Sequence, residues 1–175
     1  MAFPDPTQQL LVRRYTAADS AATWRVFHDA IHGTASRDYT PQQVQAWAPE
    51  RTDLDRWNQV RCAAHTLVAC LDETVVGFSD VTDDGEVDML FVHPDAGGRG
   101  VARALLTQVL REAAAGGHQR LVTHASLTSR PVFERFGFTV DAARVVHKRG
   151  QELRNFDMSL LLTGDAEHRS DGPVG

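Results

Sequence analysis

The sequence has few cysteines and no long apolar segment, and each shortage excludes a class of protein. Its two cysteines, Cys62 and Cys70, have neither the spacing of a metal site nor the number of a disulfide framework. No apolar run approaches the roughly 20 residues that a membrane-spanning helix needs. The first ten residues, MAFPDPTQQL, lack the basic and apolar regions of a signal peptide. We therefore expect a cytoplasmic protein that does not associate with a membrane.

Basic residues are also scarce relative to acidic ones. The chain contains 18 Lys and Arg against 23 Asp and Glu, a formal net charge of −5. Broad nucleic-acid binding needs a basic surface, so we expect no nucleic-acid partner. A cationic or amine substrate is compatible with this charge.

The 175 residues are enough for one domain with a real core. Both ends are polar and rich in proline or glycine, so we expect flexible tails over residues 1–9 and 163–175. No linker, repeat or low-complexity segment interrupts the remainder. We therefore predict a single domain over residues 10–162.

Apolar periodicity predicts a mixed α/β fold. Alternating or continuous apolar segments predict strands over 10–15, 66–71, 75–81, 86–92, 120–125, 138–148 and 153–162. Apolar residues at helical spacing predict helices over 20–31, 41–48, 52–60, 101–115 and 129–137. This order predicts a mixed central sheet of about seven strands with helices on both faces.

The stretch HPDAGGRGVARALL, residues 93–106, places bare backbone directly before a helix. Free N–H groups at a helix N-terminus form an anion cradle, which the helix dipole strengthens. A phosphate-binding P-loop is excluded, because Gly100 is followed by Val101 and Ala102 in place of Lys and Ser or Thr. A dinucleotide fingerprint is excluded because three strands of hairpin type precede the loop. On these residues alone, a flexible turn remains the alternative.

The context of the loop carries a family resemblance. VHPDAGGRGVARALL (92–106) and FERFGF (133–138) occur in the order and at the separation of two motifs of the GNAT superfamily, acyl-CoA-dependent N-acyltransferases. Those motifs are V-x-P-x-x-[Q/R]-x-x-G-x-[G/A] and Y-E-K-x-G-F, and the resemblance covers residues 10–162. YTPQQVQAWAP, ASLTSRPVFERFGF and RGQELRNFDM more narrowly resemble the YafP-like branch. The resemblance implies the GNAT fold, acetyl-CoA as the acyl donor, and no metal.

In GNAT proteins the loop binds the pyrophosphate of coenzyme A, and the strand before it pairs with the pantetheine arm. The resemblance implies main-chain contacts from Leu90 and Val92, and it puts Ser126 where many members have an Asn. Gly97 departs from the usual Gln or Arg, so one side-chain contact is missing. The implied acyl-CoA site comprises Leu90, Phe91, Val92, Gly97, Gly98, Arg99, Gly100, Val101, Ala102, Ser126, Ser129 and Phe133.

Acyl transfer to an amine needs a base, because an alkyl ammonium has a pKa near 10.4. Glu86 matches the position of the catalytic Glu of histone-modifying members, and strand alternation puts Asp88 and Leu90 on its face. Asp88 is expected mid-strand among apolar residues and nearer the thioester, as a base acting through water or as an anchor for the amine. The Leu90 N–H is expected to polarise the thioester oxygen. A solvated strand end is the alternative for Glu86.

The Tyr of the second motif is Phe133 here, so the usual proton donor to the thiolate is absent. Water, or a hydroxyl of Tyr39, Ser129 or Thr128, is expected to replace it. We predict catalytic residues Asp88, Glu86 and Tyr39. The predicted acceptor-binding residues are His28, His32, Tyr39, Trp47 and His124.

HDAIH (28–32) imitates a zinc-protease motif, but no third ligand is placed by any spacing, and we expect no metal. We predict transfer of an acetyl group to a primary amine of a small molecule or peptide, by direct attack in a ternary complex. The alternatives are a catalytically idle acyl-CoA-binding module and an enzyme for a longer acyl group such as succinyl. The C-terminal strands of this superfamily often mediate dimers, so a homodimer is possible here. The sequence does not identify the acceptor.

Overall fold

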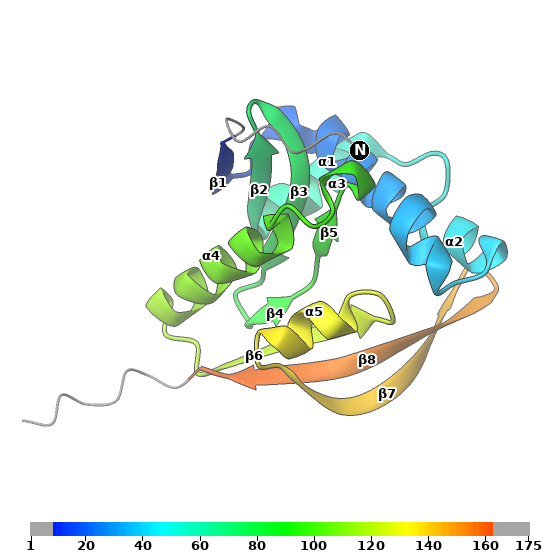
Figure 1. Ribbon diagram of the computed structural model, residues 1–175. Coiled ribbons are helices and arrows are strands. Elements are labelled where there is room, and N and C mark those ends of the chain that lie inside the picture. The colour runs from blue at the N-terminus through cyan, green and yellow to red at the C-terminus, as the bar shows by residue number, and fades with distance from the viewer. Residues whose placement is uncertain (1–8, 163–175) are drawn as a thin grey trace, which may run out of the picture.

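A computed structural model of the chain describes residues 9–162, which form two four-stranded sheets with helices packed on them (Figure 1). The strands are β1 (Leu10–Arg14), β2 (His65–Leu71), β3 (Thr74–Val81), β4 (Glu86–Val87), β5 (Leu90–Val92), β6 (Arg120–Ser126), β7 (Thr139–Lys148) and β8 (Gln151–Leu161). The helices are α1 (Ser20–Asp29), α2 (Pro41–Trp47), α3 (Leu54–Ala63), α4 (Val101–Ala115) and α5 (Arg130–Arg135). The predicted tails lie outside the described residues, except for Gln9.

The two sheets are joined by the segment that runs from β4 to β5. The first sheet has the order β1-β2-β3-β5 and is antiparallel, whereas the second has the order β4-β6-β8-β7, with β4 parallel to β6. The prediction of one continuous strand over 86–92 is wrong. The strand breaks at Asp88 and Met89, so that β4 lies in the lower sheet of Figure 1 and β5 in the upper one.

The first sheet is buried on both faces, which explains the continuous apolar run in β2. Leu67, Ala69 and Leu71 contribute to one core cluster, and Val68 and Cys70 contribute to another. Helix α4 covers the first face, and α1 and α3 cover the opposite face (Figure 1). The predicted helices on both faces are thus present.

Helix α4 approaches the sheet closely at Gly77 of β3. A Cβ atom there would lie 2.7 Å from Cγ1 of Val101 and 3.1 Å from the carbonyl oxygen of Phe91. Only a glycine permits this approach, which brings the start of α4 beside β5. The loop before α4 is thereby held next to the end of β5.

Helix α1 continues into a π-helical turn, Ala30–Thr34. Gly33 in this turn packs against Pro94, where a Cβ atom would lie 2.7 Å from the proline Cγ. Pro94 begins the short turn Pro94–Ala96 that leads into the glycine loop. The π-helical turn, a feature often found at functional sites, therefore forms a wall beside that loop.

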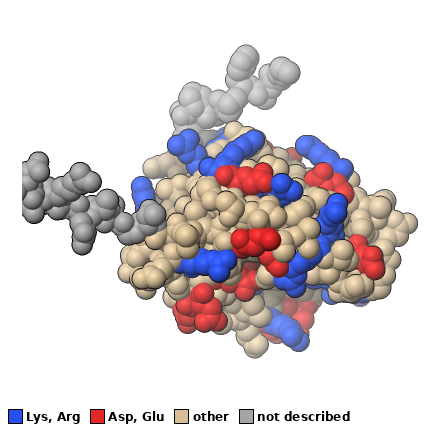
Figure 2. All heavy atoms as spheres, turned by 90° about the horizontal axis from the view of Figure 1, so that it is seen from below, with Lys and Arg blue, Asp and Glu red and all other residues tan. Residues whose placement is uncertain are grey.

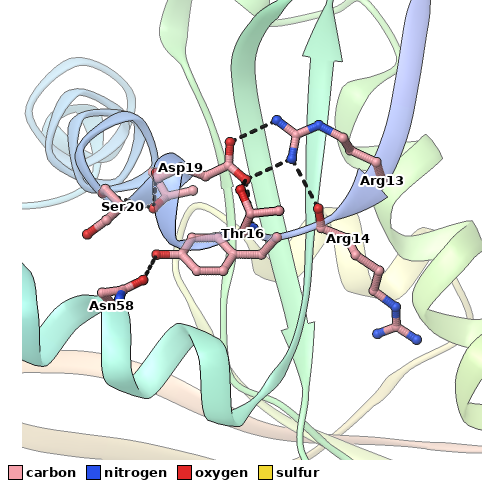
Figure 3. Close-up of polar contacts among 8 residues, drawn as sticks. Arg13, Arg14, Thr16, Asp19, Ser20 and Asn58 are labelled. Carbon is pink, nitrogen blue, oxygen red and sulfur yellow. Dashed lines mark hydrogen bonds and ion pairs between the residues drawn. The ribbon is translucent and has the colours of Figure 1, made fainter.

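The start of α1 is fixed to β1 by an ion pair with Asp19 (Figure 3). Arg13 donates from Nη1 and Nη2 to the two oxygens of Asp19, at 2.7 and 2.8 Å. The Thr16 amide donates to the same carboxylate at 2.8 Å. Nearby, the Tyr15 hydroxyl donates to Asn58 Oδ1 at 2.8 Å and connects this corner to α3. The hydrogen bond from Arg13 holds the pKa of the buried Asp19 below its usual range.

Within residues 9–162, none of the helices combines the length and the apolar character that crossing a bilayer needs.

Substitution of Asp19 by Asn should lower the free energy of unfolding by about 1.5–3 kcal/mol at neutral pH, because it removes a bidentate charge-assisted contact. The folded pKa is depressed, so this contribution is present above the unfolded carboxyl pKa of about 3.9 and is lost as the pH falls through the folded pKa. Urea unfolding across pH measures both effects. Glu134→Gln, which breaks the exposed Arg130–Glu134 pair, is the control and should cost less than about 0.5 kcal/mol. Equal losses in the two variants would contradict the role given to Asp19.

Candidate active site

The glycine loop makes a bare helix start at the N-terminus of α4. Gly98 and Gly100 have φ of +74° and +79°, a region that L side chains rarely adopt. A Cβ atom at either residue would meet nothing within 4 Å, so the space in front of the backbone is open. Gly100 is the N-cap, and within residues 9–162 no side chain caps the helix.

Several amides at this helix start are not used by the main chain of the described residues. Among residues 9–162, the N–H groups of Gly98, Gly100, Val101, Ala102 and Arg103 have no main-chain partner. Such N–H groups at the positive end of a helix dipole favour an anion. Because α4 has 15 residues, its peptide dipoles add to a helix dipole whose positive end lies at these N–H groups. The loop therefore has the chemistry of a phosphate site.

Strand β5 leaves one of its edges open. Two hydrogen bonds with β3 flank this strand. The Asp80 N–H donates to the Met89 carbonyl, and the His93 N–H donates to the Val76 carbonyl. Because antiparallel pairs alternate, the main-chain groups of Leu90 and Val92 point away from β3. β5 is also the last strand of its sheet. An extended ligand with amide groups can add to such an edge.

A cavity of about 760 Å³ extends from the glycine loop along this open edge. Ten of the twelve predicted acyl-CoA residues line it, namely Leu90, Phe91, Val92, Gly97, Gly98, Gly100, Val101, Ala102, Ser126 and Ser129. Arg99 and Phe133 do not line it, and Phe133 is buried against Phe138. Arg103 and Arg135 also line the cavity, as do Ala30 and Thr34 of the π-helical turn. A volume of this size is typical of a ligand site, and the free amides at one end suit a phosphate group.

The break between β4 and β5 is held by two residues of β3. Asp80 accepts a hydrogen bond from the Met89 amide at 3.0 Å, and the Ser79 hydroxyl donates to the Met89 carbonyl at 2.7 Å. Asp80 is fully buried, and its other oxygen accepts from Arg61 Nη1 at 2.5 Å. Arg61 is 3% exposed and lies over the Trp57 ring. A buried ion pair thus fixes the main chain at the point where the strand changes sheets.

Arg61 also lies close to Asp88, the carboxylate that we predicted near the thioester. Arg61 Nη2 lies 3.5 Å from Asp88 Oδ2, and the Asp88 side chain is 49% exposed. Asp88 was expected mid-strand among apolar residues, but the break exposes it. Burial raises the pKa of Asp80 to about 6, and the attraction of Arg61 offsets this only in part.

A second cavity, of about 250 Å³, lies beyond Leu90. Asp88, His124 and Tyr39 line it, together with side chains of β7 and β8. The two cavities share five lining residues, which are Trp47, Leu90, Phe91, Ser126 and Ser129. They therefore meet at β5 and the end of β6.

Two serines at this junction form a closed pair. The Ser126 amide donates to Ser129 Oγ at 2.9 Å, the Ser129 amide donates to Ser126 Oγ at 3.0 Å, and the two Oγ atoms lie 3.0 Å apart. One hydroxyl proton fills the contact between the oxygens. The other has no acceptor among the described residues and is available to a ligand.

The other candidate hydroxyls are committed within the protein. The Tyr39 hydroxyl donates to the Arg154 carbonyl at 2.7 Å and accepts from the Leu127 amide at 2.9 Å. Burial raises its pKa, which further disfavours loss of its proton. Thr128 donates to Asp38 at 2.6 Å. Tyr39 thus ties the segment before α2 to the second sheet.

Glu86 reaches the second cavity only through His124. Its Oε1 lies 3.4 Å from His124 Nε2, and His124 Nδ1 lies 2.6 Å from Asp157 Oδ1. Glu86 itself lines neither cavity. The break at Asp88 interrupts the alternation that had put Glu86 and Asp88 on one face. Glu86 therefore contacts His124, which lines the second cavity, but does not line that cavity itself.

His28 and His32 stack on each other, with ring centroids 4.1 Å apart, and line neither cavity. His32 Nε2 lies 2.8 Å from the Ala48 carbonyl oxygen. Across residues 9–162, no group of three or more His, Cys, Asp or Glu side chains could hold a metal ion.

The prediction missed the residues that hold the strand break and those that β7 and β8 contribute. A signal for Asp80 was present, because an acid in the apolar strand VVGFSDV implies a buried partner. Nothing in the sequence indicates that this partner is Arg61, which comes from α3.

Comparison with known proteins places this arrangement in a family. The sequence profile described as Acetyltransferase (GNAT) domain matches residues 35–162. The chain is 35% identical over 147 residues to the uncharacterized N-acetyltransferase YafP of Escherichia coli (strain K12), covering 84% of this chain and 93% of that protein. The chain therefore belongs to the GNAT superfamily of N-acetyltransferases.

Solved structures agree with this assignment. A GCN5-related N-acetyltransferase from Rhodopseudomonas palustris is 30% identical and superposes with a TM-score of 0.83, over 87% of this chain and 95% of its own. The fold is also that of yncA, a putative acetyltransferase from Salmonella typhimurium solved with its cofactor acetyl-CoA. That chain is 24% identical, with a TM-score of 0.67, over 93% of this chain and 99% of its own.

The raised pKa of Asp80 predicts a pH dependence of stability. The folded pKa is about 6 and the unfolded one about 3.9, so the contribution of Asp80 is fully present below about 3.9 and is lost as the pH rises through about 6. The stability of the wild type relative to Asp80→Asn should therefore be greater near pH 5 than near pH 7.5, by on the order of 1–2 kcal/mol.

Urea unfolding of both proteins at the two pH values measures this difference. Asp19→Asn is the matched control, because the pKa of the Asp19 carboxyl is depressed and its contribution to stability should be the same at the two pH values. A difference that does not change with pH would show that Asp80 is ionised throughout this range.

Proposed function

We propose that this protein transfers an acetyl group from acetyl-CoA to a primary amine, by direct attack while both substrates are bound. One observation carries the proposal: two cavities with different linings meet at the open edge of β5. The larger has the features of a CoA site, and the smaller contains a carboxylate. An acyl group at the junction is open to an amine from the other side.

The larger cavity would hold the donor along its length. The free amides at the start of α4 would bind the pyrophosphate, with Arg103 and Arg135 as nearby cations. The two amide groups of the pantetheine arm would pair with the unpaired main-chain groups of Leu90 and Val92, as an added strand does. When bound, acetyl-CoA would supply the activated thioester, and the chain would supply its position.

At the junction, the Leu90 amide is suited to donate to the thioester oxygen, where negative charge develops during attack. The amine nitrogen forms the new C–N bond and the C–S bond breaks. A water held by Asp88 takes the excess proton of the amine and passes it to the solvent. Arg61 fixes one oxygen of Asp88, and the other has no partner among the described residues.

The Ser126–Ser129 pair offers a replacement for the missing tyrosine. Phe133 is 3% exposed and carries no proton. The spare hydroxyl proton of the serine pair lies at the junction, where it can donate a hydrogen bond to the departing thiolate. Tyr39 and Thr128 are less suited, because their hydroxyl protons already have acceptors.

Replacement of Gly100 by Glu should weaken the binding of CoA at least about a hundredfold, because an anion at the cradle repels the pyrophosphate and removes hydrogen bonds to it. Gly117→Glu is the matched control, since Gly117 has φ of +82° and the same open surroundings but lies past the other end of α4. Calorimetric titration with CoA compares the two. Equal affinity in both variants would refute the cofactor assignment.

Asp88→Asn should lower kcat for acetyl transfer at neutral pH by about a hundredfold, the size expected for loss of a general base. The affinity for acetyl-CoA should not change, because Asp88 lies outside the larger cavity. The loss should shrink at high pH, where the amine is already neutral. Thiol release with a panel of amines provides the measurement, and Asp83→Asn, an exposed acid, is the control. A wild-type rate in Asp88→Asn would remove the residue from the mechanism.

A further inference from the structure

The smaller cavity has a basic wall that the proposed reaction does not use. Arg144 and Lys148 line it from β7, with Val146 between them in the alternation of the strand. Leu153 and Asn155 line it from β8 and pair with Val146 and Arg144. These residues therefore share one face of the second sheet, and that face looks into the cavity.

These polar groups have unused hydrogen-bonding capacity. Among the described residues, no ion pair or hydrogen bond involves the Lys148 ammonium or the Asn155 Nδ2 donor, and the buried Asn155 Oδ1 also has no partner. Arg144 donates one N–H to Asp157 at 2.9 Å and is 44% exposed, so most of its donors remain available.

Asp157 compensates only part of the positive charge of this wall. Partial burial opposes its charge, but hydrogen bonds from Arg144 and His124 outweigh that effect and hold the pKa of Asp157 below its usual range. Its carboxylate is therefore shared between Arg144 and His124, and Lys148 remains uncompensated.

The position of the charges is informative because the chain as a whole is acidic, with a net charge of −5. Figure 2 looks from below, from the side of β7 and β8, and shows acidic and basic side chains interspersed over that face. Within the cavity, by contrast, Asp88 is the one carboxylate among the lining residues, and Arg144 and Lys148 lie on the β7 wall. The cavity thus has an acidic end at the strand break and a basic end on β7.

We propose that this basic wall binds a carboxylate of the substrate, held by Arg144, Lys148 and the Asn155 amide while the reacting amine lies at Asp88. The inference rests on the proposed function. A guanidinium and an ammonium beside an amide N–H match the two oxygens of a carboxylate. The carboxylate belongs either to the acceptor, as in an amino acid, or to the far end of a dicarboxylic acyl group that reaches past the junction.

Two arms of one kinetic experiment distinguish these sources. In the first, acetyl-CoA is the donor and the acceptors are matched pairs: β-alanine with β-alaninamide, 4-aminobutanoate with its amide, and alanine with alaninamide. In the second, the acceptor is alaninamide and the donors are acetyl-CoA and succinyl-CoA. Thiol release gives kcat/KM for each. Amidation lowers the pKa of the amine and enlarges its reactive fraction, so this bias opposes the expected result.

In one of the two arms, the substrate with the carboxylate should react about 10 to 100 times more efficiently, the factor expected for a charge-assisted contact. A preference in the first arm assigns the carboxylate to the acceptor, and one in the second assigns it to the acyl group. The double variant Arg144→Gln, Lys148→Met should reduce that preference to nearly none, with a much smaller change in kcat/KM for the amidated acceptors and for acetyl-CoA. Arg120→Gln, on the same sheet but away from the cavity, is the control and should keep the preference.

The carboxylate site is overturned if neither arm shows a preference, or if the preference survives in the double variant. In either case, transfer to the amidated acceptors still supports the proposed function. If no amine in the panel releases thiol, the proposed transfer fails instead. Calorimetric titration of the CoA-loaded protein with the three amino carboxylates, and of the free protein with succinyl-CoA and acetyl-CoA, then tests the wall by itself. Equal affinity of the wild type and the double variant for the amino carboxylates and for succinyl-CoA would overturn it.

Discussion

The buried contact between Arg61 and Asp80 fixes the point on which the site depends. A peptide chain that continued in one strand from Glu86 to Val92 would satisfy its main-chain groups within a single sheet. Here the Met89 amide instead bonds to Asp80, and its carbonyl bonds to Ser79. Because Arg61 comes from α3 and Asp80 from β3, the break is secured by packing between elements distant in sequence. Asp88 beside the break is consequently exposed to the cavity and remains in contact with the same arginine.

The break creates the two halves of the site at once. Since β4 pairs with β6 in one sheet and β5 pairs with β3 in the other, Leu90 and Val92 have unpaired main-chain groups between the sheets. The close approach of α4 at Gly77 then sets the glycine loop at one end of this opening. The second sheet closes the other end with β7 and β8. In the proposed reaction, a long donor and a small acceptor would reach one carbonyl carbon from opposite sides.

Much of this arrangement could be predicted from the sequence, for physical reasons that differ between elements. The glycine loop needs positive φ and open space, which Gly98 and Gly100 provide locally. The helices and most strands follow from apolar periodicity. The burial of β2 on both of its faces follows from its continuous apolar run. The strand over 86–92 was predicted without its break, because the residues that cause the break lie elsewhere in the chain. For the same reason Asp88 was expected in apolar surroundings and is instead half exposed.

The sequence by itself determined the family, the bare glycine loop before α4 and the order of the elements, since each depends on residues that are close together in the chain. Tertiary structure alone decided which polar groups meet. It paired Arg61 with Asp80. It also gave the hydroxyl protons of Tyr39 and Thr128 acceptors within the protein. One hydroxyl proton of the Ser126–Ser129 pair, by contrast, remains available. Tertiary structure also brought two cations of β7 to the cavity of Asp88. Hydrogen bonds and ion pairs between distant segments depend on packing, and no local pattern encodes them.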